Sequence, residues 1–185
     1  MEQTDEGLME AYKGGNLAAF PDLVQRHQTL LFGYLMRMVH NREMAEDCFQ
    51  ETFLRVHKKA QTYRSGAKFK SWLFTIATRI ALDRLRKAQR RPSFQSLESC
   101  EPVPTATDSP DEATARTELR QTVQAALESL PPQQRAALIL SYYQGHTYPE
   151  IAHIMGCSLS TVKTHMSRAL KKLATRLPHP DGGLR

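Results

Sequence analysis

The stretch TYPEIAHIMGCSLSTVKTHMSRALKK, residues 147–172, carries the start and stop signals of two consecutive helices. Thr147 and Glu150 form a capping-box pattern, in which each side chain can bond a backbone amide at the start of the first helix. Gly156 is placed to end that helix in the left-handed conformation, and Ser158 is placed to cap the next one. The spacing therefore predicts two short helices joined by a tight turn.

The residues between these caps meet the steric requirements of a helix-turn-helix. Ala152 is a small residue where the helices cross, and Val162 is a branched apolar residue that can pack the second helix on the first. An ordinary helical hairpin has the same spacing, but the outward positions of the second helix are polar donors and none is acidic. We therefore predict that this helix enters the major groove of DNA. The predicted contacts are Ser158, Ser160, Thr161, Lys163, Thr164, His165, Ser167, Arg168 and Lys171, with Lys172 beside them on the DNA backbone.

Helical periodicity dominates the rest of the chain as well, and no alternating pattern typical of strands occurs. The further predicted helices are 17–38, 43–60, 71–91, 110–130 and 132–143. Between them, residues 93–109 are rich in proline, serine, threonine and acidic residues, which is typical of a solvated linker. The prediction is an all-α fold with two small helical domains, 1–92 and 110–178, a flexible linker over 93–109 and a tail over 179–185.

The positive charge of the chain is concentrated in two places. The 185 residues carry a formal net charge of +6. Residues 64–91 contain nine bases and one acid, and residues 158–176 contain five bases and no acid. Two basic surfaces indicate a polyanion that is contacted twice. The three cysteines form no CxxC pair, and no leader or membrane-spanning apolar run occurs, so we expect a protein of the reducing cytoplasm with neither disulfide framework nor metal site.

The basic helix 71–91 and the loop before it combine cations with aromatic residues. Trp72, Leu73 and Ile76 fit a buried stripe, so part of the aromatic cluster serves packing. Cations that follow a nucleic-acid backbone beside aromatic surfaces also suit single-stranded DNA. The residues predicted to bind it are Tyr63, Arg64, Lys68, Lys70, Arg79, Arg84, Arg86 and Arg90.

The helix 43–60 carries a second polar feature. Asp47, Gln50, Glu51 and Leu54 form a stripe opposite its buried face. Such a stripe is either solvated helix surface or a docking face for a basic protein partner, and the spacing alone leaves both open.

Three ordered segments resemble one protein family. AEDCFQETFLRVH (45–57), FKSWLFTIATRIALDRLRK (69–87) and LESLPPQQRAALILSYYQGHTYPEIAHIMGCSLSTVKTHMSRALKKL (127–173) are similar to regions 2.2, 2.3 to 2.4 and 4 of bacterial RNA polymerase sigma factors. The short chain resembles the extracytoplasmic-function group, which is group 4 of the sigma-70 family. The resemblance implies an initiation factor that binds core RNA polymerase and has no catalytic site, metal or cofactor of its own.

The same resemblance implies a role for each predicted surface. The stripe of Asp47, Gln50, Glu51 and Leu54 would bind the β′ clamp helices, and the second domain would meet the β flap. The loop 61–69 and the basic helix would bind the melted minus-10 element, and the helix-turn-helix would bind minus-35 as duplex. An anti-sigma factor, often membrane-anchored in such systems, is a further implied partner of a chain that does not itself enter the membrane.

Two residues depart from the family pattern. Thr78 stands where asparagine is usual, near the expected minus-10 pocket, and His165 stands where arginine is frequent. No promoter consensus is therefore carried over. Two alternatives from other classes remain: a stand-alone helix-turn-helix regulator, and a metal-dependent helical enzyme built on the Glu150–His153 pair. The lack of a strand-rich receiver domain disfavours the first, and the lack of a second ExxH pair disfavours the second.

Overall fold

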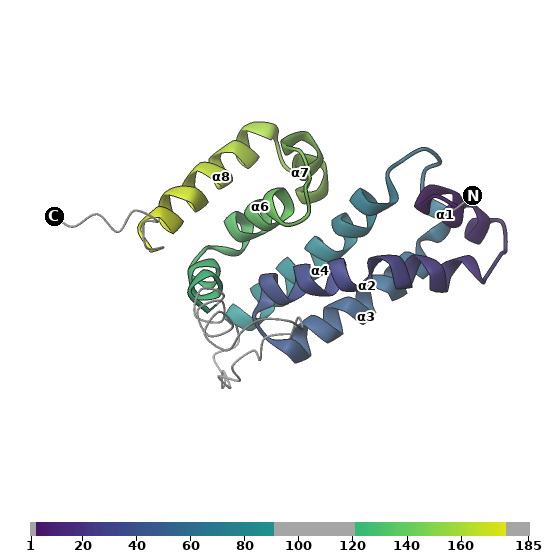
Figure 1. Ribbon diagram of the computed structural model, residues 1–185, viewed down its shortest axis with the longest axis horizontal. Coiled ribbons are helices and arrows are strands. Elements are labelled where there is room, and N and C mark those ends of the chain that lie inside the picture. The colour runs from purple at the N-terminus through teal and green to yellow at the C-terminus, as the bar shows by residue number, and fades with distance from the viewer. Residues whose placement is uncertain (1–2, 91–120, 177–185) are drawn as a thin grey trace, which may run out of the picture.

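The computed structural model describes residues 3–90 and 121–176, and every regular element in these two ranges is helical (Figure 1). The all-α prediction is confirmed for them. The predicted linker 93–109, the start of the helix predicted over 110–130 and the tail 179–185 lie outside the described residues. The elements are α1 (Asp5–Lys13), α2 (Ala19–Val39), α3 (Arg42–Lys58), the 3-10 turn η1 (Ala60–Thr62), α4 (Phe69–Arg90), a helical segment over 121–128, α6 (Pro132–Tyr142), α7 (Tyr148–Met155) and α8 (Leu159–Ala174).

The first helix of the structure, α1, was not among the predicted helices. Thr4 caps it by accepting a hydrogen bond from the Gly7 amide at 3.1 Å, and acidic residues occupy its first turn. Acidic side chains at this end favour the helix because they face the positive end of its dipole. Leu8 and Met9 are buried on its inner side. The segment is acidic, and we did not predict a helix from its sequence. In the structure it is a short amphipathic helix that packs on α2.

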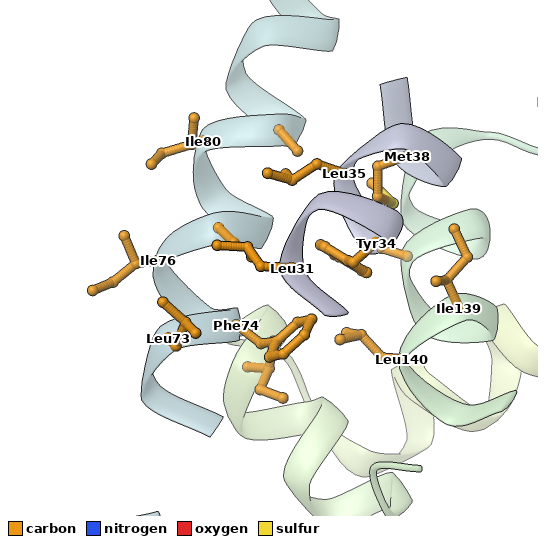
Figure 2. Packing of buried hydrophobic residues seen from close by; sticks show 14 of the residues in the cluster. Leu31, Tyr34, Leu35, Met38, Leu73, Phe74, Ile76, Ile80, Ile139 and Leu140 are labelled. Carbon is orange, nitrogen blue, oxygen red and sulfur yellow. The ribbon is translucent and has the colours of Figure 1, made fainter. Parts of the chain in front are cut away.

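Helix α2 lies at the centre of the molecule. Figure 2 shows α2 between α4 and α6, with Leu31 and Leu35 directed toward α4 and with Tyr34 and Met38 near α6. These four side chains are fully buried. Burial of each such side chain stabilises the fold by about 1.5–3 kcal/mol. Helix α3 packs on α2 and α4 from the other side.

The two predicted domains share one apolar core. Ile139 and Leu140 of α6 are fully buried, and Figure 2 shows Leu140 directed toward Phe74 of α4. The same cluster continues through Ile151 and Val162 of the helix-turn-helix. Helix α7 lies against α4, so the second domain covers one side of the first. The composition of the linker 93–109 does not specify how the two domains are placed relative to each other. The contact between α4 and α7 is known only from the tertiary structure.

A buried arginine joins the two domains at the end of α2. Arg135 of α6 is only 6% exposed, and its guanidinium donates hydrogen bonds to the carbonyl oxygens of Met38, Glu128 and Leu130. The Met38 carbonyl belongs to the last turn of α2, where carbonyls lack partners within the helix and the dipole is negative. A cation from the second domain therefore completes the end of a helix in the first.

Candidate nucleic-acid and protein interfaces

The predicted docking stripe lies on the outer face of α3. Asn41 caps this helix through a hydrogen bond from the Met44 amide at 2.7 Å, and Ala45, Cys48 and Val56 are buried beneath it. Leu54 is 51% exposed and offers an apolar side chain on this face. Asp47 and Gln50 are exposed, and Glu51 is half-buried. The structure thus brings all four stripe residues together on one accessible helix face.

The two carboxylates of this stripe are bridged by an arginine from the neighbouring helix. Arg84 of α4 places Nη1 3.3 Å from Asp47 Oδ2 and Nη2 3.1 Å from Glu51 Oε2. Arg55 donates to the other Glu51 oxygen at 2.5 Å. Partial burial raises the pKa of Glu51, but the hydrogen bonds from Arg84 and Arg55 outweigh it and lower the pKa below its ordinary value. Glu51 is therefore a charged carboxylate held by two arginines.

Arg84 was predicted to bind DNA, and in the free chain its side chain contacts α3. The sequence placed Arg84 among the cations of the basic helix, but in the fold it faces α3 and not the open side of α4. Arg79, Arg86 and Arg90 are exposed on α4, and Arg86 bonds Asp83 of its own helix at 3.2 Å. Bases that look continuous along the sequence of α4 thus divide between two surfaces.

Tyr63, also predicted to bind single-stranded DNA, is buried in the free chain. It was expected to offer an aromatic surface to an unstacked base, and the residue is 2% exposed. The ring packs against Trp72 with a centroid distance of 5.2 Å, and its hydroxyl donates to the Ala67 carbonyl. Burial raises the pKa of Tyr63 to about 12, so it stays a neutral donor. In this structure Tyr63 shapes the loop, while Arg64 and Lys68 beside it are exposed.

Thr78, expected near the minus-10 pocket, lies in the core. Its side chain is fully buried and its hydroxyl bonds the Tyr34 hydroxyl at 2.7 Å. Burial, only partly offset by this bond, raises the pKa of Tyr34 well above its usual range. Thr78 therefore takes part in an internal polar contact between α2 and α4.

A pocket of 680 Å³ opens where the two domains meet. The loop and the first turn of α4 form one wall, and α7 forms the other. Among its lining residues are Tyr63, Arg64, Lys68, Trp72, Glu150 and His153. Three of the residues predicted to bind single-stranded DNA, Tyr63, Arg64 and Lys68, therefore face the helix-turn-helix across a cleft.

Lys68, which lines the pocket, and Lys70 in the first turn of α4 are both bonded to the second domain. Lys68 donates to Glu150 Oε1 at 2.8 Å, and Lys70 donates to the Gln144 carbonyl at 2.7 Å. The hydrogen bond from Lys68, with those from the Thr147 amide and hydroxyl, lowers the pKa of Glu150 to about 2. Glu150 thus serves the capping box of α7 and an interdomain ion pair at once. Nothing in the sequence pattern of Gln144, Glu150 or Arg135 predicted these interdomain contacts.

The helix-turn-helix has the predicted local geometry. Gly156 ends α7 with φ 65°, Thr147 and Glu150 form the capping box, and Ser158 accepts a hydrogen bond from the Thr161 amide at 3.1 Å. Val162 is fully buried against α7, while Ala152 is partly buried. These predictions are confirmed.

The outer face of α8 carries the residues predicted to contact duplex DNA. Thr161 and His165 are half-buried, and Ser158, Ser160, Lys163, Thr164, Ser167, Arg168 and Lys171 are exposed. Burial and the neighbouring Arg168 lower the pKa of His165, which keeps its ring neutral at neutral pH. Lys172, predicted to hold the DNA backbone, instead donates to the Ser129 carbonyl. The exposed cations among these predicted contacts are Lys163, Arg168 and Lys171, and Lys163 lies nearest the N-terminus of α8.

Within residues 3–90 and 121–176, no group of three metal-ligating side chains comes together. His153 is exposed, and both Glu150 oxygens are hydrogen bonded. In the same two ranges, none of the helices combines the length and the apolar character needed to cross a membrane.

Comparison with known families places both halves of the chain. Residues 23–91 match the family model of sigma-70 region 2, and residues 120–173 match that of sigma-70, region 4. The chain is 36% identical to the RNA polymerase sigma factor CarQ of Myxococcus xanthus, with 89% of this chain and 92% of that protein covered. It is 33% identical to the ECF RNA polymerase sigma factor SigM of Mycobacterium tuberculosis H37Rv, with coverages of 99% and 89%. It is 35% identical to the ECF RNA polymerase sigma factor SigE of Mycolicibacterium smegmatis, of which it spans 63% of the length.

Solved structures of similar fold include two protein complexes. The sigma factor RpoE in complex with the anti-sigma factor NepR from Bartonella quintana matches with a TM-score of 0.69 and 26% identity, over 86% of this chain and 98% of that one. The structure of CnrH in complex with the cytosolic domain of CnrY matches with the same TM-score at 24% identity, over 92% and 95% of the two chains, which is a likeness of fold.

Proposed function

Because the chain belongs to the sigma-70 family of RNA polymerase sigma factors, and within it to the ECF group, we propose that it directs core RNA polymerase to promoters. It lends sequence specificity to the polymerase and catalyses no step itself. The observation that supports this function most directly is the separation of two kinds of surface. An acidic and amide stripe lies on α3, while polar and cationic donors cover α8.

The α3 stripe is the proposed contact with the β′ clamp helices. Asp47, Gln50 and Glu51 provide oxygen acceptors for a basic partner, and exposed Leu54 provides an apolar contact. Complementary charge of this kind speeds the encounter of two proteins and orients them. A contact between the second domain and the β flap completes the proposed docking.

The minus-10 element is proposed to bind the loop and α4 as melted DNA. The cations available there are Arg64, Lys68, Lys70, Arg79, Arg86 and Arg90. Cations that follow the backbone of a single strand suit this role because they need no base pairing. Lys68 and Lys70 are bonded to the second domain in the free chain. We therefore expect these two contacts to break when DNA takes their place.

The minus-35 element is proposed to bind the exposed face of α8 as duplex. Lys163 and Arg168 supply charge to phosphates or base edges, and the hydroxyls of Ser160, Thr161 and Thr164 supply short polar contacts. Thr164 already donates to the Ser160 carbonyl at 3.0 Å, so its hydroxyl is held on the helix surface. The neutral His165 contributes a polar ring without fixed charge.

An anti-sigma factor is a second proposed protein partner. Support comes from the fold shared with RpoE, whose solved structure contains the anti-sigma factor NepR. A protein that binds this chain would act in the cytoplasm, where the polymerase and the promoters are. Such an inhibitor would act by covering the docking stripe or by holding the two domains together.

The deciding experiment is transcription by purified core polymerase on a library of promoter fragments, with and without this protein. We expect discrete transcripts only when the protein is present. The reversal Glu51→Lys should abolish core binding while the chain stays folded, which far-UV circular dichroism checks. Tight binding to duplex DNA together with no binding to core would instead favour the stand-alone regulator.

A further inference from the structure

Arg84 of α4 forms ion pairs with two carboxylates of α3. This arrangement suggests a role at the α3 surface, which the position of Arg84 in the basic helix did not indicate. Its two terminal nitrogens contact one oxygen of Asp47 and one oxygen of Glu51, at 3.3 and 3.1 Å. Asp47 and Glu51 are one helical turn apart on α3, so their side chains are neighbours on one face. Arg84 comes from α4, 33 residues after Glu51 in the chain.

Two carboxylates at this spacing repel each other when nothing lies between them. A planar guanidinium is suited to hold both, because its N–H groups point in fixed directions and it remains charged at any pH in the physiological range. The Arg84 side chain is 40% exposed, while the Asp47 and Glu51 side chains are 54% and 27% exposed. The bridge is therefore partly solvated, and both carboxylates remain accessible from outside.

The other arginines around the stripe do not make such a bridge. Arg55 contacts only Glu51, and both lie on α3. Arg86 contacts Asp83, and both lie on α4. Only the Arg84 side chain, among those the structure describes around the stripe, ties α4 to the two acidic positions that face the solvent.

We propose that Arg84 is a positioning residue of the polymerase-docking face, which holds the Asp47 and Glu51 carboxylates side by side for a basic partner. It acts through these two carboxylates and makes no contact with promoter DNA. This inference rests on the proposed function, since it assumes that the α3 stripe binds core polymerase. The inference assigns Arg84 of the basic helix to the surface that binds core polymerase and removes it from the surface that binds promoter DNA.

A mutant cycle on the full-length chain tests the inference. The variants are Arg84→Ala, the pair Asp47→Asn with Glu51→Gln, and the three changes combined, each titrated against core polymerase by fluorescence anisotropy. We expect Arg84→Ala to weaken core binding by roughly twofold to fivefold, the range typical of partly exposed ion pairs. The combined variant should bind no more weakly than the carboxylate pair variant, because Arg84 then has nothing left to position.

Two further variants separate positioning from general loss of charge. Arg84→Lys should recover only part of the affinity, because an ammonium group cannot contact both carboxylates with the geometry of a guanidinium. Arg42→Ala is the matched control: Arg42 bonds Glu46 on the same helix α3 at 2.9 Å and lies outside the stripe. Its loss removes one positive charge and one ion pair, and core affinity should stay unchanged.

The promoter readout distinguishes the protein role from a DNA role. With preformed holoenzyme, the Arg84→Ala variant should keep the salt dependence of promoter binding, whereas loss of a phosphate contact would lower the slope by about one unit. An unchanged core affinity for Arg84→Ala, or a further weakening in the combined variant, would overturn the positioning role. If the carboxylate pair variant itself binds core normally, the docking assignment on α3 fails instead, so the two failures are distinguishable.

Discussion

At the scale of single residues, side chains of the same type perform different tasks according to where the fold places them. Arg135 is buried and completes the end of a helix, while Arg84 is half-exposed and bridges two acids. Tyr63 and Thr78 lie in the interior, although their residue types also suit a DNA surface. Residue type therefore sets what a side chain can do, and burial decides which of these options it uses.

The loss of the Arg135 guanidinium should destabilise the chain. In Arg135→Ala, the Met38, Glu128 and Leu130 carbonyls lose their donor in a buried setting, which costs roughly 1–3 kcal/mol. Urea unfolding followed by circular dichroism measures this loss. The exposed Arg42→Ala change should stay within about 0.5 kcal/mol of the wild type. Equal stabilities for the two variants would show that the buried hydrogen bonds add nothing net.

Glu150 should add a pH-dependent part to stability in acid. Its pKa is lowered from 4.5 to about 2 in the folded chain, so folding favours the charged carboxylate. This contribution is fully present above pH 4.5 and is lost as the pH falls toward 2. Thermal unfolding across that window should therefore show a smaller acid-induced decrease for Glu150→Gln than for the wild type. Parallel curves would mean that the Lys68 and Thr147 contacts do not favour the charged form.

At the scale of elements, the angle between α7 and α8 depends on the turn that joins them. Gly156 has φ 65° and joins the two helices, and nothing lies within 4 Å of a Cβ added there. Any cost of a side chain at this position is therefore conformational. Since the turn sets the angle at which α8 leaves α7, it also sets the presentation of the outer α8 face.

Gly156→Ala should cost about 1–2 kcal/mol, because a side chain disfavours the left-handed conformation. Gly14→Ala is a matched control: Gly14 also ends a helix, but with φ −74°, which alanine adopts freely. Chemical denaturation of the two variants compares these costs directly. If both changes have the same effect, the left-handed turn is not what constrains Gly156.

The charge on α8 should appear in the salt dependence of binding to the minus-35 element. Replacement of Lys163 by alanine should weaken holoenzyme binding and, where a phosphate contact is lost, lower the salt slope by about one unit. Arg168→Ala should act in the same way. Arg42→Ala on α3 provides the comparison for loss of one charge elsewhere. Unaltered slopes for both α8 variants would place this helix away from the DNA.

At the scale of the whole molecule, the two domains are joined by apolar and polar contacts together. Leu140 and Phe74 meet in the shared core, and the His146 ring lies 5.4 Å from the Phe74 ring between centroids. Around this apolar centre, Lys68 bonds Glu150 and Lys70 bonds Gln144. Part of the proposed minus-10 surface therefore lies against the second domain, and we expect the use of Lys68 and Lys70 to require these contacts to loosen.

Glu150→Gln should favour that loosening without removing the start of α7. Glutamine also serves in a capping box, while the ion pair with Lys68 is lost. We expect the free variant to bind a single-stranded minus-10 oligonucleotide more tightly than the wild type, by roughly twofold to fivefold. Anisotropy titration measures the change, and distance measurement by fluorescence energy transfer between the domains checks the opening. Equal affinities would show that this ion pair does not restrict the DNA surface.

The sequence by itself determined the all-α class, the bounds of the longer helices to within a few residues, and the local geometry of the helix-turn-helix, but not the short helix α1. These features depend on residues within one or two turns of each other: the spacing of apolar positions, the capping pair of Thr147 and Glu150, and the conformational freedom of Gly156. Only the tertiary structure decided that Arg84 faces α3, that Tyr63 is buried and that Lys68 meets Glu150. These contacts join residues far apart in the chain, and they arise from how whole helix faces pack, which periodicity within one helix does not specify.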